Sequence, residues 1–292
     1  MDRKKNIVLN GEIVPADQPV LSIENRGFRF GDTIFETIRY HKGIPLFFDD
    51  HFNRLLQGMT TFKMNLNSLP SKDKLKNQIE TLVTKSRIFG DARIRLTVFR
   101  NDGGLYTPAS NDVSYTIEAS SVKKELFSLD KKGLLLDVYY QHRKPITQLH
   151  SFKNANSILY VLAGIFKKEL LLDDCLIINE NNEIIEGLSS NLFWIKNKTV
   201  YTPLLSTGCV DGIMRKQVIN AVNHSDLDMQ EVAGSSIDEL LNADEIFLTN
   251  SIQGVRWVMG IQNQRFYNLT TKKIVQLLIT NLQLLLDEES SN

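Results

Sequence analysis

Hydrophobic and polar positions follow two different periods along the chain, and each period predicts a local structure. Ile94, Leu96 and Val98 alternate with polar residues, as in a strand that buries one face. Elsewhere apolar residues recur every three or four positions, which is the spacing of an amphipathic helix. The predicted helices begin near Asp49, begin after Pro70-Ser71, span about 158–171, follow Gly212, and span about 269–286.

Tight turns join several short apolar runs and predict hairpins. Asn10-Gly11 supplies the positive φ that a two-residue hairpin turn requires. A capping-box pattern that begins at Ser235-Ser236 places a short helix between strands near 229–232 and 245–249. Further strands are expected at 134–140, in a hairpin over 175–185, and in a hairpin over 191–202. The interleaved hairpins and helices indicate an α+β protein.

A chain of 292 residues is long enough to form two domains, each with its own core. The polar stretch 120–125 is the best candidate for the linker. We therefore expect a small N-terminal α+β domain over 1–120 and a larger C-terminal α+β domain over 121–292. Within the first, segment 26–32 contains two glycines and is expected to be a loop that leads into a strand at 35–40.

Composition narrows the class of protein. The 34 basic residues equal the 34 acidic residues and are scattered, which argues against a nucleic-acid partner or an anionic membrane surface. Two cysteines without a C-x-x-C spacing favour neither a disulfide framework nor a metal site. The charged segment 1–6 lacks the apolar core of a signal peptide, and 269–286 carries too many polar residues for a membrane span. We expect a cytoplasmic protein with no metal.

Lys153 lies just before the helical pattern that starts at Ile158. A lysine is usually a solvated surface charge. At the mouth of a helix, however, the positive end of the helix dipole disfavours an ammonium and so favours the neutral amine. The neutral amine is the form that attacks a carbonyl carbon in Schiff-base chemistry. Lys153 is therefore a candidate nucleophile.

Two pairs of side chains leave alternatives open. His51 and Arg54 lie three residues apart on one predicted helix face, and the simplest interpretation is that both are solvated. Arg93 and Arg95 lie on the polar face of the strand at 93–100. This pattern is expected of an edge strand with solvated charges, and equally of a pocket in which Arg95 binds a substrate carboxylate.

Two further positions are ambiguous when taken alone. Glu186 falls at a strand end, where a carboxylate is usually exposed. Segment 208–215 leads into a helix, and the backbone N–H groups of a helix N-terminus can bind an anion without a basic side chain. An ordinary helix start explains that segment equally well.

Several blocks of sequence, taken together and in order, resemble the fold-type IV pyridoxal-phosphate enzymes. This family includes branched-chain aminotransferases, D-amino acid aminotransferases and 4-amino-4-deoxychorismate lyases. The resemblance implies a two-domain fold like that of D-amino acid aminotransferase, pyridoxal 5'-phosphate held between the domains, and a homodimer. The blocks are Asn10-Gly11, 26–32, 35–39, 51–55, 153–156, 186–193, 212–215 and 249–251.

The same resemblance implies roles for individual residues. Lys153 would form an aldimine with the cofactor and then act as general base, and Glu186 would keep the pyridine nitrogen protonated. The catalytic set is Lys153, Glu186 and Thr37. The cofactor would also be bound by the guanidinium of Arg54, by Asn191, by the backbone N–H groups of Ile213 and Met214, and by the hydroxyl of Ser251. The substrate carboxylate would bind Arg39 or Arg95, with Arg100 a third candidate.

Within the family the motifs resemble 4-amino-4-deoxychorismate lyases most. Segment 153–156 has the K-x-x-N form of lyases and D-amino acid aminotransferases, and Ile158 stands where branched-chain enzymes place a tyrosine. Such a lyase releases pyruvate and 4-aminobenzoate for folate synthesis from a small-molecule amino substrate. The alternative is a class IV aminotransferase of branched-chain L-amino acids or D-amino acids, which segment 35–39 also approaches.

Two other classes of protein fit the sequence less well. A Ser-His-Asp hydrolase could draw on Ser151 and His150, but no G-x-S-x-G turn is present, and side chains adjacent along a chain rarely meet in triad geometry. A binding protein that had lost catalysis would lack the amine of Lys153 or the carboxylate of Glu186, and both residues are present.

Overall fold

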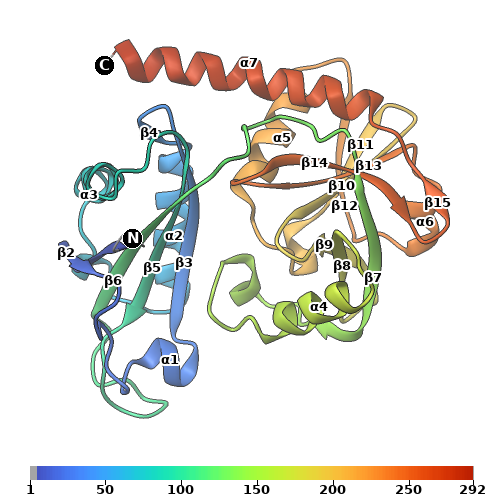
Figure 1. Ribbon diagram of the computed structural model, residues 1–292. Coiled ribbons are helices and arrows are strands. Elements are labelled where there is room, and N and C mark those ends of the chain that lie inside the picture. The colour runs from blue at the N-terminus through green and yellow to red at the C-terminus, as the bar shows by residue number, and fades with distance from the viewer. Residues whose placement is uncertain (1–4, 292) are drawn as a thin grey trace. The chain divides into compact units, whose positions relative to one another are not determined.

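The computed structural model describes residues 5–291, and the side chains of 5–287. The chain divides into two compact units (Figure 1). The first unit runs up to Lys123 and also takes in Phe152–Asn156. The second contains Lys124–Ser151 and the chain from Ser157 onward. The segment that carries Lys153 therefore belongs to the first unit, although both of its flanks belong to the second.

The first unit is built on a mixed-length antiparallel sheet of six strands. Their order is β2-β1-β6-β5-β3-β4. The Asn10-Gly11 turn has positive φ at both residues, 49° and 96°, and joins the first hairpin as expected. The strands are β1 Asn6–Leu9, β2 Glu12–Pro15, β3 Thr33–His41, β4 Ile44–Pro45, β5 Ala92–Arg100 and β6 Val113–Ser121.

Helices α2 (Phe48–Thr61) and α3 (Lys72–Lys85) contribute the apolar residues that cover one face of this sheet (Figure 1). Ser71 caps α3, because its side chain accepts a hydrogen bond from the backbone N–H of Lys74. A 3-10 turn, Leu66–Ser68, precedes it. Alternate residues of the strands, including Ile94, Leu96 and Val98, are fully buried against the helices. The opposite face of the sheet carries the intervening polar residues.

The prediction of a loop at 26–32 is wrong over most of that segment, because Arg26–Phe30 forms the short helix α1. The Asn25 side chain accepts from the N–H of Phe28 and caps the start, and Gly31 ends the helix with a left-handed φ of 66°. Arg26 is buried and donates to Asp32 at 2.9 Å, and Arg100 donates to the same oxygen at 2.9 Å. These ion pairs, together with the cap, make a helix of a segment whose two glycines suggested a loop.

Segment Phe152–Asn156 adds a short extended stretch to the first unit. The N–H of Phe35 donates to the carbonyl of Lys153 at 2.8 Å, and the N–H of Ala155 donates to the carbonyl of Thr33 at 3.1 Å. Asn154 forms an antiparallel bridge with Ile34. The backbone around Lys153 is thus paired directly to β3.

The second unit is a nine-stranded sheet that closes on itself. Its order is β12-β11-β10-β13-β14-β7-β8-β9, with β15 beside β14, and β9 pairs back to β10 through Glu186 and Asn191. Closure encloses an apolar core that contains Trp194, Ile246 and Leu248. The strands are β7 Leu134–Lys144, β8 Asp174–Asn179, β9 Ile184–Gly187, β10 Asn191–Lys196, β11 Thr199–Pro203, β12 Asp228–Val232, β13 Glu245–Asn250, β14 Gly254–Ile261 and β15 Gln264–Arg265.

Four helices accompany this sheet: α4 Ile158–Glu169, α5 Ile213–Asn223, α6 Ile237–Leu241 and α7 Leu269–Ser291. Ser236 caps α6 by accepting from the N–H of Glu239, as the capping-box pattern predicts. Short 3-10 turns lie at Gln148–Ser151 and Leu205–Thr207. Figure 1 shows α5 next to the long α7, and residues of the two helices are in contact.

Helix α4 buries some of its apolar side chains and exposes others. Ala163 is buried, and Leu162 and Phe166 pack beside it, whereas Ile158 is 70% exposed and Ile165 is 49% exposed. The apolar residues of this helix therefore lie on more than one of its faces.

The sequence argued against a membrane span and against a signal peptide, and the described residues allow only the first expectation to be compared with the structure. No helix among residues 5–291 combines the length and the apolar character needed to cross a membrane. The charged N-terminal segment that argues against a signal peptide begins with residues 1–4, which lie outside the described residues.

Candidate active site

The amine of Lys153 lies beside an aromatic ring of β3. Its Nζ is 5.9 Å from the centroid of the Phe35 ring. The side chain is half-buried, and its backbone is held by the pairing with β3. The expected position at a helix mouth is wrong, because Lys153 lies in an extended segment ahead of the first turn of α4. Its surroundings in the first unit come instead from β3 and from α2, to whose residue His51 it is electrostatically coupled.

A buried carboxylate joins β3 to α2 next to this lysine. Glu36 Oε2 lies 2.6 Å from His51 Nδ1, and Glu36 Oε1 accepts from Arg54 Nε at 2.8 Å. All three side chains are almost completely buried. The interpretation of His51 and Arg54 as solvated side chains is therefore wrong. The sequence showed that the two share a helix face but did not show that Glu36 lies opposite them.

Burial and charge act against each other within this cluster. Burial alone would raise the pKa of Glu36, but the charge of Arg54 and the hydrogen bond from His51 lower it to about 2. Burial lowers the pKa of His51, with only partial compensation from Glu36, so its imidazole is neutral near pH 7. Nε2 of this ring is buried and has no hydrogen-bond partner among the described residues. The cluster thus holds one carboxylate, one guanidinium and one neutral imidazole.

Three predicted residues lie on the face of the first sheet that points away from α2 and α3. Thr37 is directly opposite Arg95, and Arg39 is opposite Arg93. The guanidinium carbon of Arg95 is 3.6 Å from the centroid of the Phe35 ring, so Arg95 and Lys153 both contact one ring. The edge-strand interpretation is wrong, because β5 pairs with β3 on one side and with β6 on the other.

The three candidate arginines differ in what they bind. Arg39 is buried and donates to Asp91, whose other oxygen lies 2.8 Å from His41 Nδ1. Arg100 is buried and binds Asp32, Asn111 and two backbone carbonyls. Arg95 forms no ion pair with any carboxylate among the described residues, and burial together with the charge of Arg93 lowers its pKa. Of the three, Arg95 has the guanidinium best able to bind a carboxylate.

In the second unit, Glu186 lies at the point where β9 meets β10 and is buried. Three donors hold its carboxylate. Lys144 Nζ and the Tyr160 hydroxyl donate to Oε1 at 2.7 Å and 2.6 Å, and the Val210 N–H donates to Oε2 at 2.9 Å. Glu186 is thus the buried end of a hydrogen-bond network, which differs from the exposed strand-end carboxylate that is common elsewhere.

Sequence patterns did not indicate a function for Lys144 or Tyr160. Lys144 is the last residue of β7, immediately before Pro145, and a lysine at a strand end is usually solvated. Tyr160 falls within the apolar pattern of α4 and resembles a core residue. Burial, followed by the nearby charge of Glu186, raises the pKa of Tyr160 well above its usual value, so the hydroxyl keeps its proton at neutral pH and donates a hydrogen bond to the carboxylate. No local signal marks Lys144, because the polar residues Gln141, His142 and Arg143 come directly before it.

Asn191 orients the turn that leads into α5. Its pairing with Glu186 places it beside that carboxylate, and its Nδ2 donates to the carbonyl of Val210 at 2.7 Å. A Cβ atom at Gly212 would lie 1.8 Å from Asn191 Oδ1, so this position requires glycine. Glu186, Asn191 and the 210–212 turn therefore form one connected structure.

The first backbone N–H groups of α5 have no side-chain cap. Gly212 is the N-cap and provides no side-chain hydrogen bond, while Ile213 and Met214 are both buried. A buried, uncapped N-terminus of an eleven-residue helix is suited to bind an oxyanion. Ser251 lies in the turn after β13, where Asn250 donates to the Ser190 hydroxyl at 3.0 Å. The second unit thus assembles Glu186, Asn191, Ile213, Met214 and the Ser251 turn.

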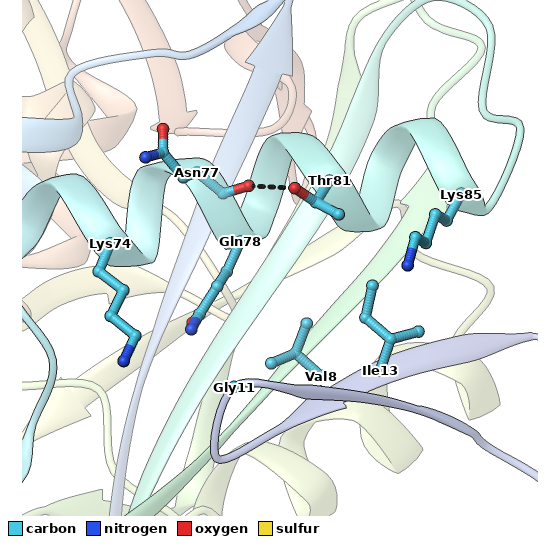
Figure 2. Close-up of a pocket in the computed structure, with 8 residues that line it drawn as sticks. All are labelled: Val8, Gly11, Ile13, Lys74, Asn77, Gln78, Thr81 and Lys85. Atoms are coloured by element: carbon cyan, nitrogen blue, oxygen red, sulfur yellow. Dashed lines mark hydrogen bonds between the residues drawn. The ribbon is translucent and has the colours of Figure 1, made fainter.

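A groove of about 570 Å³ lies elsewhere in the first unit, between α3 and the β1–β2 hairpin (Figure 2). Figure 2 shows the Thr81 hydroxyl bonded to the Asn77 carbonyl within the helix, and exposed lysines at 74 and 85. None of the residues expected to bind a cofactor or substrate lines it. The groove is separate from the Lys153 surroundings.

A family model described as amino-transferase class IV matches residues 33–261. The chain belongs to the class IV aminotransferase family. The match extends from the first residue of β3 to the last residue of β14 and includes Lys153, Glu186 and Ser251. Enzymes of this family depend on pyridoxal 5'-phosphate, which is therefore the cofactor of this enzyme.

Relatives in the family carry out different reactions. The chain is 28% identical over 253 residues to aminodeoxychorismate lyase of Bacillus subtilis, covering 84% of this chain and 83% of that protein. It is 26% identical over 281 residues to D-alanine aminotransferase of Bacillus licheniformis, covering 88% and 89%. The solved branched-chain amino acid aminotransferase of Escherichia coli has the same fold, with a TM-score of 0.82, 21% identity, and 94% and 92% of the two chains covered.

The residues present fit pyridoxal 5'-phosphate. An amine is supplied by Lys153 in the first unit, and a buried carboxylate by Glu186 in the second. The uncapped N-terminus of α5 is suited to a phosphate group, and the buried Nε2 of His51 is an unpartnered polar atom close to the lysine. Such a donor and acceptor set matches a ligand that has an aldehyde, a pyridine nitrogen and a phosphate.

We expect Glu36 and His51 to make the first unit sensitive to acid. Glu36 has a lowered pKa in the folded state, so its stabilising effect is complete above pH 4.5 and is lost as the pH falls toward 2. The shift corresponds to roughly 3 kcal/mol. His51 also has a lowered pKa, so the unfolded chain begins to bind its proton preferentially below about pH 6.5.

Chemical denaturation followed by circular dichroism between pH 2 and 7 measures this effect. Glu36→Gln should be less stable at pH 7, because Arg54 loses its partner, and its stability should vary less between pH 4.5 and 2. Glu12→Gln changes an exposed carboxylate of the same unit and should reproduce the wild-type profile. Equal pH profiles for Glu36→Gln and wild type would contradict the assignment.

Proposed function

We propose that the protein is a 4-amino-4-deoxychorismate lyase that produces 4-aminobenzoate and pyruvate for folate synthesis. The observation that carries the proposal is the similarity to the Bacillus subtilis lyase along most of both chains. The surroundings of Lys153 add support. Ile158, five residues after the lysine, is largely exposed and has no hydroxyl, and the nearby Tyr160 binds Glu186. Branched-chain enzymes, by contrast, have a tyrosine at the position that Ile158 occupies in this chain.

We also propose that the Lys153 cluster and the Glu186 cluster act on one cofactor molecule. Pyridoxal phosphate, when bound, supplies an aldehyde that condenses with amines and a ring that accepts the electron pair of a broken C–H bond. The amine of Lys153 removes the proton from the carbon that bears the substrate amino group. Breakage of the neighbouring C–O bond then releases pyruvate and leaves the aromatic amine.

The other residues of the proposed site bind and orient. Glu186 holds a proton on the ring nitrogen, and its own position is fixed by Lys144, Tyr160 and the Val210 N–H. Arg54 and the N–H groups of Ile213 and Met214 bind the phosphate together with Ser251, while Asn191 orients the turn before α5. Arg95 binds a substrate carboxylate, with Arg39 and Thr37 on the same sheet face.

A second candidate function is transamination of D-amino acids. Its support is the match to D-alanine aminotransferase, which has nearly the same identity and coverage as the lyase match. A branched-chain aminotransferase is supported by 29% identity over 268 residues to a probable branched-chain-amino-acid aminotransferase of Aquifex aeolicus. The early proton transfer would be the same in all three enzymes, so the distinction lies in what leaves the substrate.

The deciding assay mixes the cofactor-loaded protein with aminodeoxychorismate in the absence of any keto acid. We expect continuous release of pyruvate and 4-aminobenzoate in equal amounts, because a lyase regenerates its cofactor in each turnover. A single turnover that stops would reject the lyase and favour the aminotransferase. D-alanine and L-leucine, each with 2-oxoglutarate, would then identify the donor.

Glu186→Gln should slow proton abstraction more than it weakens cofactor binding. Glutamine keeps the shape but cannot stabilise the proton on the ring nitrogen, and each unit of lost pKa bias amounts to about 1.4 kcal/mol. Single-turnover rates, compared with the affinity for the cofactor, separate the two effects. Glu169→Gln removes a carboxylate at the end of α4 and is the control. Equal single-turnover rates in wild type and Glu186→Gln would remove Glu186 from the mechanism.

We further propose that the enzyme is a cytoplasmic homodimer. Support comes from the family resemblance and from α4, where Ile158, Val161 and Ile165 are exposed at spacings of three and four residues. An apolar helix face of this kind is suited to pack against a second copy of the chain. Sedimentation should give twice the mass of 33.3 kDa, and Val161→Asp should shift the population toward the monomer. A wild-type monomer at micromolar concentration would contradict the proposal.

A further inference from the structure

Strand β5 presents two arginines on the same face of the first sheet. Side chains alternate along a strand, and the fully buried Ile94 lies between Arg93 and Arg95 and points to the opposite face. Arg93 and Arg95 are therefore neighbours, each half-buried. Across the strands, Arg93 is opposite Arg39 and Ser120, and Arg95 is opposite Thr37 and Glu118.

The acidic groups on this face already have other partners. Asp91 binds Arg39 and lies within hydrogen-bonding distance of His41. Glu118 forms its ion pair with Lys5, at 3.8 Å, although its charge also acts on Arg95 at longer range. Neither Arg93 nor Arg95 has a carboxylate within 4 Å in the part of the chain that the structure describes. Two guanidinium groups thus lie side by side without a matching pair of carboxylates.

The position of this pair relates it to the Lys153 amine. The Phe35 ring contacts Arg95, at 3.6 Å from the guanidinium carbon, and has the Lys153 amine 5.9 Å from its centroid. The two cations are therefore separated by less than the sum of these distances, within one unit of the protein. Stacking on Phe35 also restricts Arg95, so less side-chain entropy is lost when it binds a ligand.

We propose that Arg93 binds a second, remote carboxylate of the substrate beside the carboxylate that Arg95 binds, so that the enzyme selects amines that carry two carboxylates. A single guanidinium binds one carboxylate through two parallel hydrogen bonds. Arg93, at the neighbouring position on the same face, supplies donors for the second carboxylate, and the bound carboxylates offset the repulsion between the two guanidinium groups. Arg93 is then a specificity-determining residue. The inference rests on the proposed function only in taking Lys153 as the reacting amine.

The alternative is that Arg93 is a solvated surface charge that contributes nothing to binding. On that view, neutralising Arg93 would relieve repulsion and leave ligand affinity unchanged. The two views therefore predict opposite effects on dicarboxylate binding, and no turnover is needed to measure them.

The test measures binding of glutarate and of pentanoate to the cofactor-loaded protein by calorimetry. The two probes have the same chain length and differ by one carboxylate. We expect glutarate to bind at least tenfold more tightly, and Arg93→Gln to weaken glutarate about tenfold while changing pentanoate less than twofold. Lys85→Gln, which removes one positive charge on α3 at the other face of the sheet, should change neither affinity.

Arg93→Lys supplies a second control, because it keeps the charge but loses the forked donor geometry. It should recover part of the glutarate affinity, and its recovery would also show that the site is intact. Equal glutarate affinity in wild type and Arg93→Gln would overturn the proposal, as would equal binding of glutarate and pentanoate by wild type. A dicarboxylate preference that persists when the lyase assay fails would keep this site and reject only the proposed reaction.

Discussion

Two backbone hydrogen bonds determine the surroundings of Lys153. They join Phe35 to Lys153 and Ala155 to Thr33, and so attach a five-residue segment to β3 of the first unit. Because the backbone is fixed, the amine lies beside the Phe35 ring, in the same unit as the Glu36 cluster and the paired arginines of β5. The chain connects this segment to the second unit at both ends, and the family match covers the whole region.

Glu36 in the first unit and Glu186 in the second are buried carboxylates, and each has several hydrogen-bond donors. Glu36 is held by an imidazole and a guanidinium, and Glu186 by an ammonium, a phenol and a backbone N–H. Buried carboxylates without such donors would be protonated or would destabilise the fold. The donors hold both carboxylates in one orientation, and the charge of Arg54 and the hydrogen bond from His51 lower the pKa of Glu36.

The sequence predicted most elements of the fold and only part of the site. Periodicity located the helices and hairpins because burial acts on every third, fourth or second residue. It failed at 26–30, where Asn25 and the ion pairs of Arg26 and Arg100 stabilise a short helix, and at β5, whose polar face suggested an edge. It also missed Lys144 and Tyr160, because their partner Glu186 is 42 and 26 residues away along the chain. Local pattern contains no information about such pairings.

The attachment of Phe152–Asn156 to β3 has a consequence for how this protein can be divided. Neither unit is encoded by one continuous stretch of the gene. The segment Phe152–Asn156 belongs to the first unit but lies in sequence between two parts of the second. A cut at Lys123 would yield one fragment with the Glu36 cluster but without Lys153, and another with Lys153 but without the strand to which its backbone pairs. Recombination between relatives that exchanged one half would therefore separate the lysine from the strand that positions it, so the two halves are constrained to change together.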